Sequence, residues 1–563
     1  MLKNKNSIYY VLFFILFGIF FVYNLFSLPK EMDEQSVFDV DVRLVEYKNN
    51  NNFSLEQIRE VWSSITGSPS SECNIYVNIK STPFYSLVRF YLLKLPIHPQ
   101  VTFNIFNLII SILVFYSSYL LIKLLFDNIT AIKSLIIMLS FYGLYTVTRF
   151  SGRGYMVIGL VFILFGCYFI WKSILSGKQH YLIYGGVFMG LSWNTGNNMT
   201  KLTPGFLLIT LIFYIIHYLK QNKFSFKKIF DLVLNILLFS GFLIVTSVFV
   251  AKIIAYTFEV DTNFWSFLLN KEFRKDIPVT ASFNVGFNEI FRRLRLFIFF
   301  PKFNDVINHM DEFFYNKALI PEFYVVFLIL SIFYLKKNFR TSPLKFSYIA
   351  VFTLVPFALI FTLYPQWEIR YQLIFLPFLA LLVVLGMQYY FEVLAIKIKK
   401  EIYRRIISGV IIIIVGVIFL SKIYNVTFGD YAKSWNNCQS MAGHRFTSDA
   451  LKVMYKKYDK TMTLMQDFMY SEGICAYLGF DINHRYKMLG SCAPTTEDSI
   501  SKFFDQYTKE NGKVFIVVAD GWHYGRLVGW YPNIKLELIK KIKLPKVRSF
   551  HGTGLSLYCV NGI

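Results

Sequence analysis

Residues 8–35, IYYVLFFILFGIFFVYNLFSLPKEMDEQ, decide what kind of chain this is. Residues 8–28 carry no charge, and about 20 apolar residues in a helix span the ~30 Å hydrocarbon core of a bilayer. Lys3 and Lys5 precede the stretch, as in a secretory signal peptide, but the apolar part is too long and Ser27-Leu28-Pro29-Lys30 is a poor cleavage site. We therefore predict an uncleaved first transmembrane helix, followed at once by a cluster of carboxylates.

Apolar runs of this kind recur as far as residue 423. The 563-residue chain is 55% hydrophobic and 19% aromatic, with a mean hydropathy of +0.45, which is far too apolar for a soluble protein of this length. The sequence predicts a polytopic α-helical membrane protein with about eleven transmembrane helices. We expect these helices at 8–28, 102–122, 134–149, 155–171, 181–193, 203–219, 229–256, 320–335, 346–363, 371–391 and 406–423.

The net charge of +23 would suggest nucleic acid as the partner of a soluble protein. Here the basic residues lie mostly in alternate loops, as the positive-inside rule requires, so the charge indicates topology and not nucleic-acid binding. With a cytoplasmic N-terminus, the short loops on the far side hold only Arg149, Arg153, Lys201 and Arg370. The short cytoplasmic segments hold nineteen bases, namely Lys3, Lys5, Lys123, Lys133, Lys172, Lys178, Lys220, Lys223, Lys227, Lys228, Lys336, Lys337, Arg340, Lys345, Lys397, Lys399, Lys400, Arg404 and Arg405.

This topology divides the chain into two domains. Residues 1–423 form the transmembrane domain, with large extracytoplasmic segments at 29–101 and 257–319. Residues 424–563 form a small C-terminal extracytoplasmic α/β domain, because hydropathy falls there and strand-like and helix-like stretches alternate. Its clearest predicted strand is Lys513–Ala519, and its clearest predicted helix is Ser448–Tyr458.

Two segments outside the apolar runs predict amphipathic helices on the membrane surface. Asn288–Phe300 sets three arginines among apolar residues. Pro83–Leu95 would place one apolar face on the membrane, formed by Phe84, Leu87, Val88, Tyr91, Leu92 and Leu95.

Asp33 and Glu34 follow the first predicted helix, so their carboxylates would lie at the outer membrane surface. An acidic juxtamembrane loop is often only solvated. A carboxylate held there can also reach the headgroup of a lipid substrate and the hydroxyl of an acceptor together. A sugar hydroxyl attacks well only when a base removes its proton, which Asp or Glu can do. The same pair could hold a divalent metal ion or act without one, and the sequence leaves both open.

Four basic residues, Arg149, Arg153, Lys201 and Arg370, lie at helix ends on the same predicted side as this acidic pair. Each alone is explained equally well as a snorkelling anchor. Together they would form a cationic face for a phosphate, and arginine favours bidentate contacts with phosphate. If a sugar leaves a lipid phosphate, negative charge grows on that phosphate, and preplaced cations stabilise this transition state.

The order of these motifs resembles the GT-C superfamily of membrane glycosyltransferases, in the branch of protein O-mannosyltransferases and lipid A aminoarabinose transferases. Asp33-Glu34 matches the acidic motif, and Ser81-Thr82-Pro83-Phe84-Tyr85 is similar to the family's Pro-Pro-Leu-Tyr, departing from it at Thr82 and Phe84. Arg149-Phe150-Ser151-Gly152-Arg153-Gly154-Tyr155 resembles the Arg-x-Tyr position. Thr200-Lys201 resembles a Thr-Lys position, and Arg370-Tyr371 with Leu376-Pro377 resembles the final motif.

The resemblance implies an inverting glycosyltransferase that moves a sugar from a polyprenyl-phosphate carrier to a lipid A, glycan or protein acceptor on the extracytoplasmic face, in bacteria the periplasmic side of the inner membrane. Asp33 would be the base or acceptor orienter, with Glu34 second. The donor phosphate would be bound by Lys80, Arg153, Lys201 and Arg370, and further candidates are Arg149, Tyr155, Tyr371 and Tyr85.

The residues alone leave two alternative functions open. A transporter or flippase would place ionisable residues in the middle of its helices, whereas here the candidates lie at helix ends and the helix centres carry almost no charge. An O-antigen polymerase or ligase would more typically place arginines in a large loop, which Arg292, Arg293 and Arg295 would allow.

Overall fold

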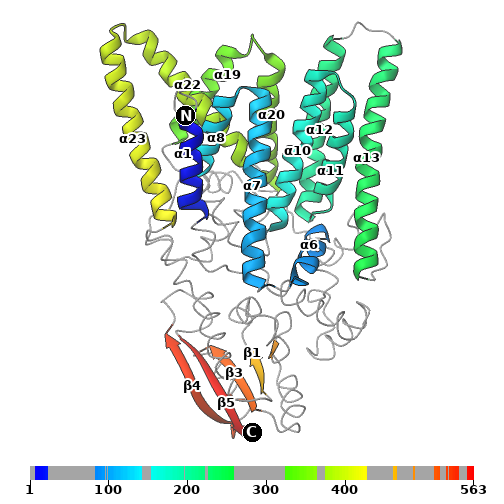
Figure 1. Cartoon of the computed structure of the whole chain (residues 1–563), viewed down its shortest axis with the longest axis vertical. Coiled ribbons are helices and arrows are strands. Elements are labelled where there is room, and N and C mark those ends of the chain that lie inside the picture. Colours follow the sequence, from blue (N-terminus) through cyan, green and yellow to red (C-terminus); the bar gives the residue numbers. More distant parts are fainter. Residues whose placement is uncertain are drawn as a thin grey trace.

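The computed structural model is a bundle of long helices with a β-sheet beyond one of its ends (Figure 1). The structure describes residues 7–22, 83–95, 97, 99–141, 154–195, 197–221, 226–258, 324–363, 375–427, 461–465, 486–488, 513–519, 528–529, 532–543 and 554–562. The predicted helices at 288–300 and 448–458 lie outside these residues.

A helix overlaps each of the eleven ranges predicted from the sequence. The helices are α1 (Ser7–Leu16) with its π-helical continuation η1 (Phe17–Val22), α7 (Pro99–Leu125), α8 (Asn128–Met138), α10 (Gly154–Ser176), α11 (His180–Trp193), α12 (Asn197–Gln221), α13 (Phe226–Phe258), α19 (Tyr324–Asn338), α20 (Pro343–Leu363), α22 (Leu376–Lys397) and α23 (Glu401–Thr427). Within the described residues, five helices are long and apolar enough to cross a bilayer, namely α7, α10, α13, α22 and α23. The chain is therefore an integral membrane protein.

The start of α8 differs from the prediction. Hydropathy placed the helix from residue 134, after Lys133, but α8 begins at Asn128. The reason is a side-chain cap, since Asp127 Oδ1 accepts hydrogen bonds from the backbone N–H groups of Ile129 and Thr130, both at 2.8 Å. Lys133 therefore lies within a helix, and its assignment to a loop was wrong.

Glycines bring neighbouring helices into backbone contact. Gly186 and Gly190 are one turn apart on α11, a spacing that lets membrane helices approach closely. A Cβ atom on Gly190 would lie 2.6 Å from the Leu243 carbonyl oxygen of α13, and one on Gly186 would lie 2.5 Å from that of Phe239. Gly386 of α22 is closer still to α19, because its added Cβ would meet the Phe327 carbonyl oxygen at 1.8 Å. These contacts fix the positions of α11, α13, α19 and α22.

The two ends of the bundle differ in charge. Lys123, Lys220, Lys336 and Lys397 lie in the last turns of α7, α12, α19 and α22, and these four helices end on the same side of the bundle, which we call the basic end (Figure 1). The short helix α6 (Pro83–Leu93) and the sheet lie at the other end. The sequence predicted basic residues in alternate loops, and the four helices that end in a lysine-bearing turn indeed run toward the same end of the bundle.

Within the described residues, five strands form one mixed sheet in the order β2-β1-β3-β5-β4. They are β1 (Thr461–Met465), β2 (Tyr486–Met488), β3 (Lys513–Ala519), β4 (Lys535–Lys543) and β5 (Gly554–Gly562). β1 pairs in parallel with β2 and β3, and β5 pairs antiparallel with β3 and β4. The predicted strand Lys513–Ala519 is confirmed, and the boundary of the C-terminal domain at residue 424 stays a prediction.

Candidate active site

The candidate site lies at the end of the bundle where α6 packs against α7, α10 and α13. α6 begins at Pro83, inside the motif that resembles the family's Pro-Pro-Leu-Tyr. The backbone N–H of Phe84 donates to the carbonyl oxygen of Asn194 at 2.9 Å, just after α11 ends. The Phe84 ring also meets Phe162 of α10 edge to face, with 5.6 Å between ring centroids. The motif is therefore anchored to two of the long helices.

Tyr85 and Arg89 form the buried side of α6. Tyr85 is fully buried, and its ring stacks on Phe106 of α7 with 6.3 Å between centroids. The Arg89 guanidinium lies 4.6 Å from the centre of the Tyr85 ring, and its Nη2 donates to Ser86 Oγ at 3.2 Å. Arg89 is only 1% exposed, which places this cation–π contact inside the protein.

Exposure differs around this helix. Tyr91 and Leu95, which belong to the face predicted to lie on the membrane, are 54% and 42% exposed, and the membrane contact of this face stays a prediction. Arg89, to which the sequence analysis gave no role, is buried. The apolar periodicity alone could not find this, since a guanidinium over a tyrosine ring can be buried where its hydropathy argues against burial. Arg89 is thus a candidate functional residue that the sequence analysis missed.

Near the start of α6, buried polar side chains join four helices. Ser192 Oγ lies 2.9 Å from Thr203 Oγ1 of α12 and donates to the carbonyl oxygen of Gly159 in α10 at 3.3 Å. Asn194 Nδ2 donates to the Ser247 carbonyl oxygen of α13 at 3.3 Å, and Ser247 Oγ donates back to the Gly190 carbonyl oxygen at 3.3 Å. These buried bonds hold α10, α11, α12 and α13 together under the candidate site.

Among the long helices that begin at this end are α10 and α12. α10 starts at Gly154 and α12 at Asn197, and the unpaired N–H groups of a helix N-terminus favour anions. Tyr155 is the second residue of α10, and Lys201 lies in the second turn of α12. For both residues the structure describes the helical backbone, so their predicted contacts stay predictions.

Most of the other predicted site residues lie outside the described residues. These are Asp33, Glu34, Lys80, Arg149, Arg153, Arg370 and Tyr371. The described helix ends nearest to them in the chain are Val22 of η1, Pro83 of α6, Gly154 of α10 and Leu376 of α22, and all four lie at the α6 end of the bundle. In the described part of the chain, no three His, Cys, Asp or Glu side chains gather in a way that would hold a metal ion.

The helix bundle, the short helix α6 and the terminal sheet define a polytopic helical membrane protein with a mixed sheet beyond one end of its bundle. Comparison with solved structures identifies the fold as that of ArnT from Cupriavidus metallidurans. In the apo state ArnT is 11% identical to this chain with a TM-score of 0.55, and the match covers 99% of this chain and 98% of ArnT. ArnT bound to undecaprenyl phosphate matches with 10% identity, a TM-score of 0.55 and the same coverage.

No protein-family profile and no curated protein sequence matches the chain. The likeness to the two ArnT structures shows the fold of this chain. The likeness extends over almost the whole of both chains.

Proposed function

We propose that the protein is an inverting glycosyltransferase that moves a hexose or pentose from a polyprenyl-phosphate donor to a lipid, glycan or protein acceptor. The observation that carries this proposal is the fold shared with ArnT along nearly the full length of both chains, since ArnT has been solved with undecaprenyl phosphate bound. The proposal is supported by the position of α6, whose start is anchored to Asn194 and whose Arg89 is buried over Tyr85.

In the proposed reaction, Asp33 accepts the proton of the acceptor hydroxyl while its oxygen attacks the anomeric carbon, and Glu34 supports it. The bond from that carbon to the phosphate oxygen breaks on the opposite face, so the configuration inverts and the lipid phosphate leaves as an anion. Lys80, Arg153, Lys201 and Arg370 would bind this phosphate, with Arg149, Tyr155 and Tyr371 beside them. Cations placed in advance stabilise the growing charge without further reorganisation.

Arg89 and Tyr85 would act as positioning residues. Lys80 comes three residues before α6, so the placement of α6 decides where Lys80 can reach. Tyr85 contacts both Phe106 and the Arg89 guanidinium, and its stacking on Phe106 joins the first turn of α6 to α7. Small displacements of groups that position a substrate cost large factors in rate, about 10²-fold for 1 Å.

We further propose eleven membrane crossings, with the basic end of the bundle in the cytoplasm and the α6 end outside. The concentration of lysine at the ends of α7, α12, α19 and α22 supports this orientation through the positive-inside rule. In a bacterium this orientation places the reaction on the periplasmic side of the inner membrane. A lipid-borne donor suits that side, because nucleotide sugars are normally absent there. Asp33 and Glu34 could also hold a divalent metal ion, and removal of metal by a chelator tests whether transfer needs it.

The test is transfer of radiolabelled sugar from a panel of polyprenyl-phosphate sugars to membrane extracts. Wild type is compared with Asp33→Asn and Arg370→Ala at matched expression, with and without a chelator. We expect the wild type to label an acceptor and both variants to lose this transfer. Full transfer by both variants would refute the site assignment. No transfer from any donor, together with movement of the lipid across the bilayer, would favour a flippase.

A further inference from the structure

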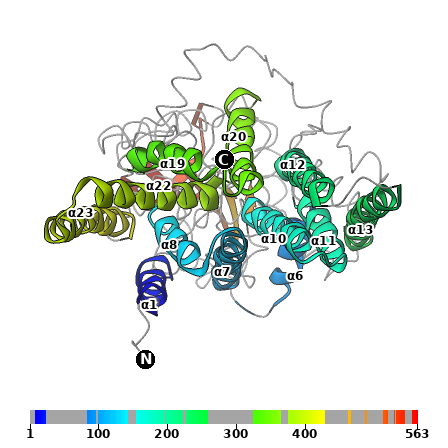
Figure 2. The ribbon, with the colours of Figure 1, turned by 90° about the horizontal axis from the view of Figure 1, so that it is seen from above.

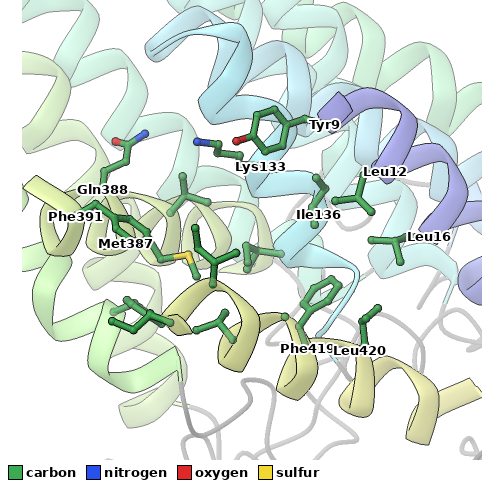
Figure 3. Close-up of a pocket in the computed structure, with 17 residues that line it drawn as sticks. Tyr9, Leu12, Leu16, Lys133, Ile136, Met387, Gln388, Phe391, Phe419 and Leu420 are labelled. Atoms are coloured by element: carbon green, nitrogen blue, oxygen red, sulfur yellow. The ribbon is translucent and has the colours of Figure 1, made fainter. Parts of the chain in front are cut away.

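A pocket of about 400 Å³ lies on the other flank of the bundle, between α1, α8, α19, α22 and α23 (Figure 3). Its volume is within the range of roughly 300–1,000 Å³ that small-molecule pockets occupy. Apolar side chains form nearly all of its wall, among them Leu16 of α1, Ile136 of α8 and Phe419 of α23. The polar groups of the lining are those of Tyr9, Lys133 and Gln388, which Figure 3 shows together on one side of the pocket.

The pocket has the dimensions of one leaflet. Along α23 its lining extends from Ile411 to Leu420, which at ~1.5 Å per residue is about 13 Å. Half of a ~30 Å hydrocarbon core has a similar length. The polar side lies toward the basic end of the bundle, because Lys133 follows the start of α8 at Asn128 by only five residues.

The pocket is bounded on its outer side by a helix that packs loosely. α23 lies at the edge of the bundle (Figure 2), and its Ile413 and Val417 are 65% and 61% exposed. An apolar chain from the surrounding bilayer can therefore enter beside α23 without crossing a polar layer.

Lys133 supplies the charge that selects the headgroup. Its ammonium lies 5.0 Å from the centre of the Tyr9 ring, and no carboxylate of the described residues pairs with it. The nearby Asp127 carboxylate is occupied by the cap of α8 and by the Thr130 hydroxyl at 2.8 Å. An ionised side chain within a membrane-spanning segment is costly unless an anion or water accompanies it, and a lysine can snorkel toward the headgroup level.

We propose that this pocket binds one acyl chain of an anionic glycerophospholipid from the leaflet at the basic end, with the lipid phosphate at Lys133 Nζ. The occupant is not the sugar donor in its reactive position, because α6 and the helix ends nearest the predicted donor-binding residues are at the opposite end of the bundle. The bound lipid fills the space beside α23 and joins this helix to α1 and α8. The inference stands on the pocket alone and does not require glycosyl transfer.

The charge is tested by native mass spectrometry of the full-length protein, with phosphatidylglycerol, phosphatidylcholine of the same chains and undecaprenyl phosphate as separate probes. We expect wild type to retain one phosphatidylglycerol, Lys133→Gln to bind it about tenfold more weakly, and Lys133→Arg to keep it. Lys123→Gln is the matched control, since Lys123 lies 5.5 Å from the Tyr119 ring near the same end but does not line the pocket.

The pocket itself is tested with two glycines of α23. Adding a Cβ to Gly416 or Gly409 meets no atom within 4 Å, but only Gly416 lines the pocket. Gly416→Phe is expected to lose the lipid and Gly409→Phe to retain it. This pair tests the pocket independently of Lys133→Gln, so a folding defect of the lysine variant would not leave the proposal untested. Equal retention by Lys133→Gln and wild type, equal retention of phosphatidylcholine, or displacement by equimolar undecaprenyl phosphate would each overturn the proposal.

Discussion

α10 and α23 have similar hydropathy but differ strongly in how much of their surface is buried. Their apolar spans, Met156–Ser176 and Glu401–Ser421, are both 21 residues long, yet 72% of the apolar window is buried in α10 and only 6% in α23. α10 packs on α7, α11 and α12 and borders the candidate site, whereas α23 has one sparsely packed flank beside the lipid pocket. Apolar length therefore predicts that a helix crosses the membrane, while contacts decide whether it supports the reaction or faces lipid.

The difference between tightly and sparsely packed helices is tested most sharply by replacing a glycine with a large side chain. Gly190→Leu places a side chain where the α13 backbone already lies, so we expect the free energy of unfolding to fall by about 3 kcal/mol. The leucine of Gly409→Leu on α23 enters open space, so the free energy of unfolding of this variant is expected to stay within about 0.5 kcal/mol of wild type. Thermal unfolding of the purified variants in detergent measures both. Similar losses in the two variants would mean that α23 is packed as tightly as α11.

The next effect concerns activity at the tightly packed end. Arg89→Gln is expected to lower the turnover of sugar transfer about 10²-fold, because Tyr85 and the first turns of α6 lose their fixed position. Lys94→Gln is the control, since Lys94 lies 4.4 Å from the Phe90 ring on the same segment but is exposed. Arg89→Lys is expected to recover part of the turnover. A purely structural role would lower the unfolding temperature of Arg89→Gln and leave the turnover per folded molecule unchanged.

A smaller effect is expected from the polar bonds under the site. Ser192→Ala leaves Thr203 and the Gly159 carbonyl oxygen without their buried partner, and should cost about 2 kcal/mol of stability. Ser408 of α23 makes no side-chain hydrogen bond with the described residues, and Ser408→Ala should be close to neutral. Thermal unfolding of the two variants side by side distinguishes a supported helix end from a lipid-facing one.

The smallest effect is expected at the start of α8, beside the pocket. Asp127→Ala removes the cap on Ile129 and Thr130 and should cost about 1 kcal/mol. Gln179 occupies the corresponding position before α11 but makes no capping bond, so Gln179→Ala should leave the unfolding temperature unchanged. Equal shifts in the two variants would show that the cap does not set the start of α8.

The sequence predicted the helices well because a bilayer demands long apolar segments, and each predicted range overlaps a helix. It failed at Lys133, because an aspartate cap started α8 before the apolar run began. It also failed at Arg89, because burial of a guanidinium depends on a tyrosine and a neighbouring helix that no local pattern reveals.

The predicted catalytic and phosphate-binding residues show a further limit. Asp33 and Arg370 were chosen by position in the chain and by resemblance, and both lie outside the described residues. The lipid pocket had no sequence signal, since its lining comes from five separated helices whose common feature is apolarity. Burial and contact between distant segments thus account for what the sequence could not predict.

The most direct test of the proposed function uses the purified protein in sealed proteoliposomes with one labelled polyprenyl-phosphate sugar and an acceptor extract. Transfer and movement of the intact donor across the bilayer are followed in the same vesicles, and the anomeric configuration of the product is determined by nuclear magnetic resonance. We predict transfer with inversion by wild type, and none by Asp33→Asn. Movement of intact donor without transfer, or a product with retained configuration, would contradict the proposal.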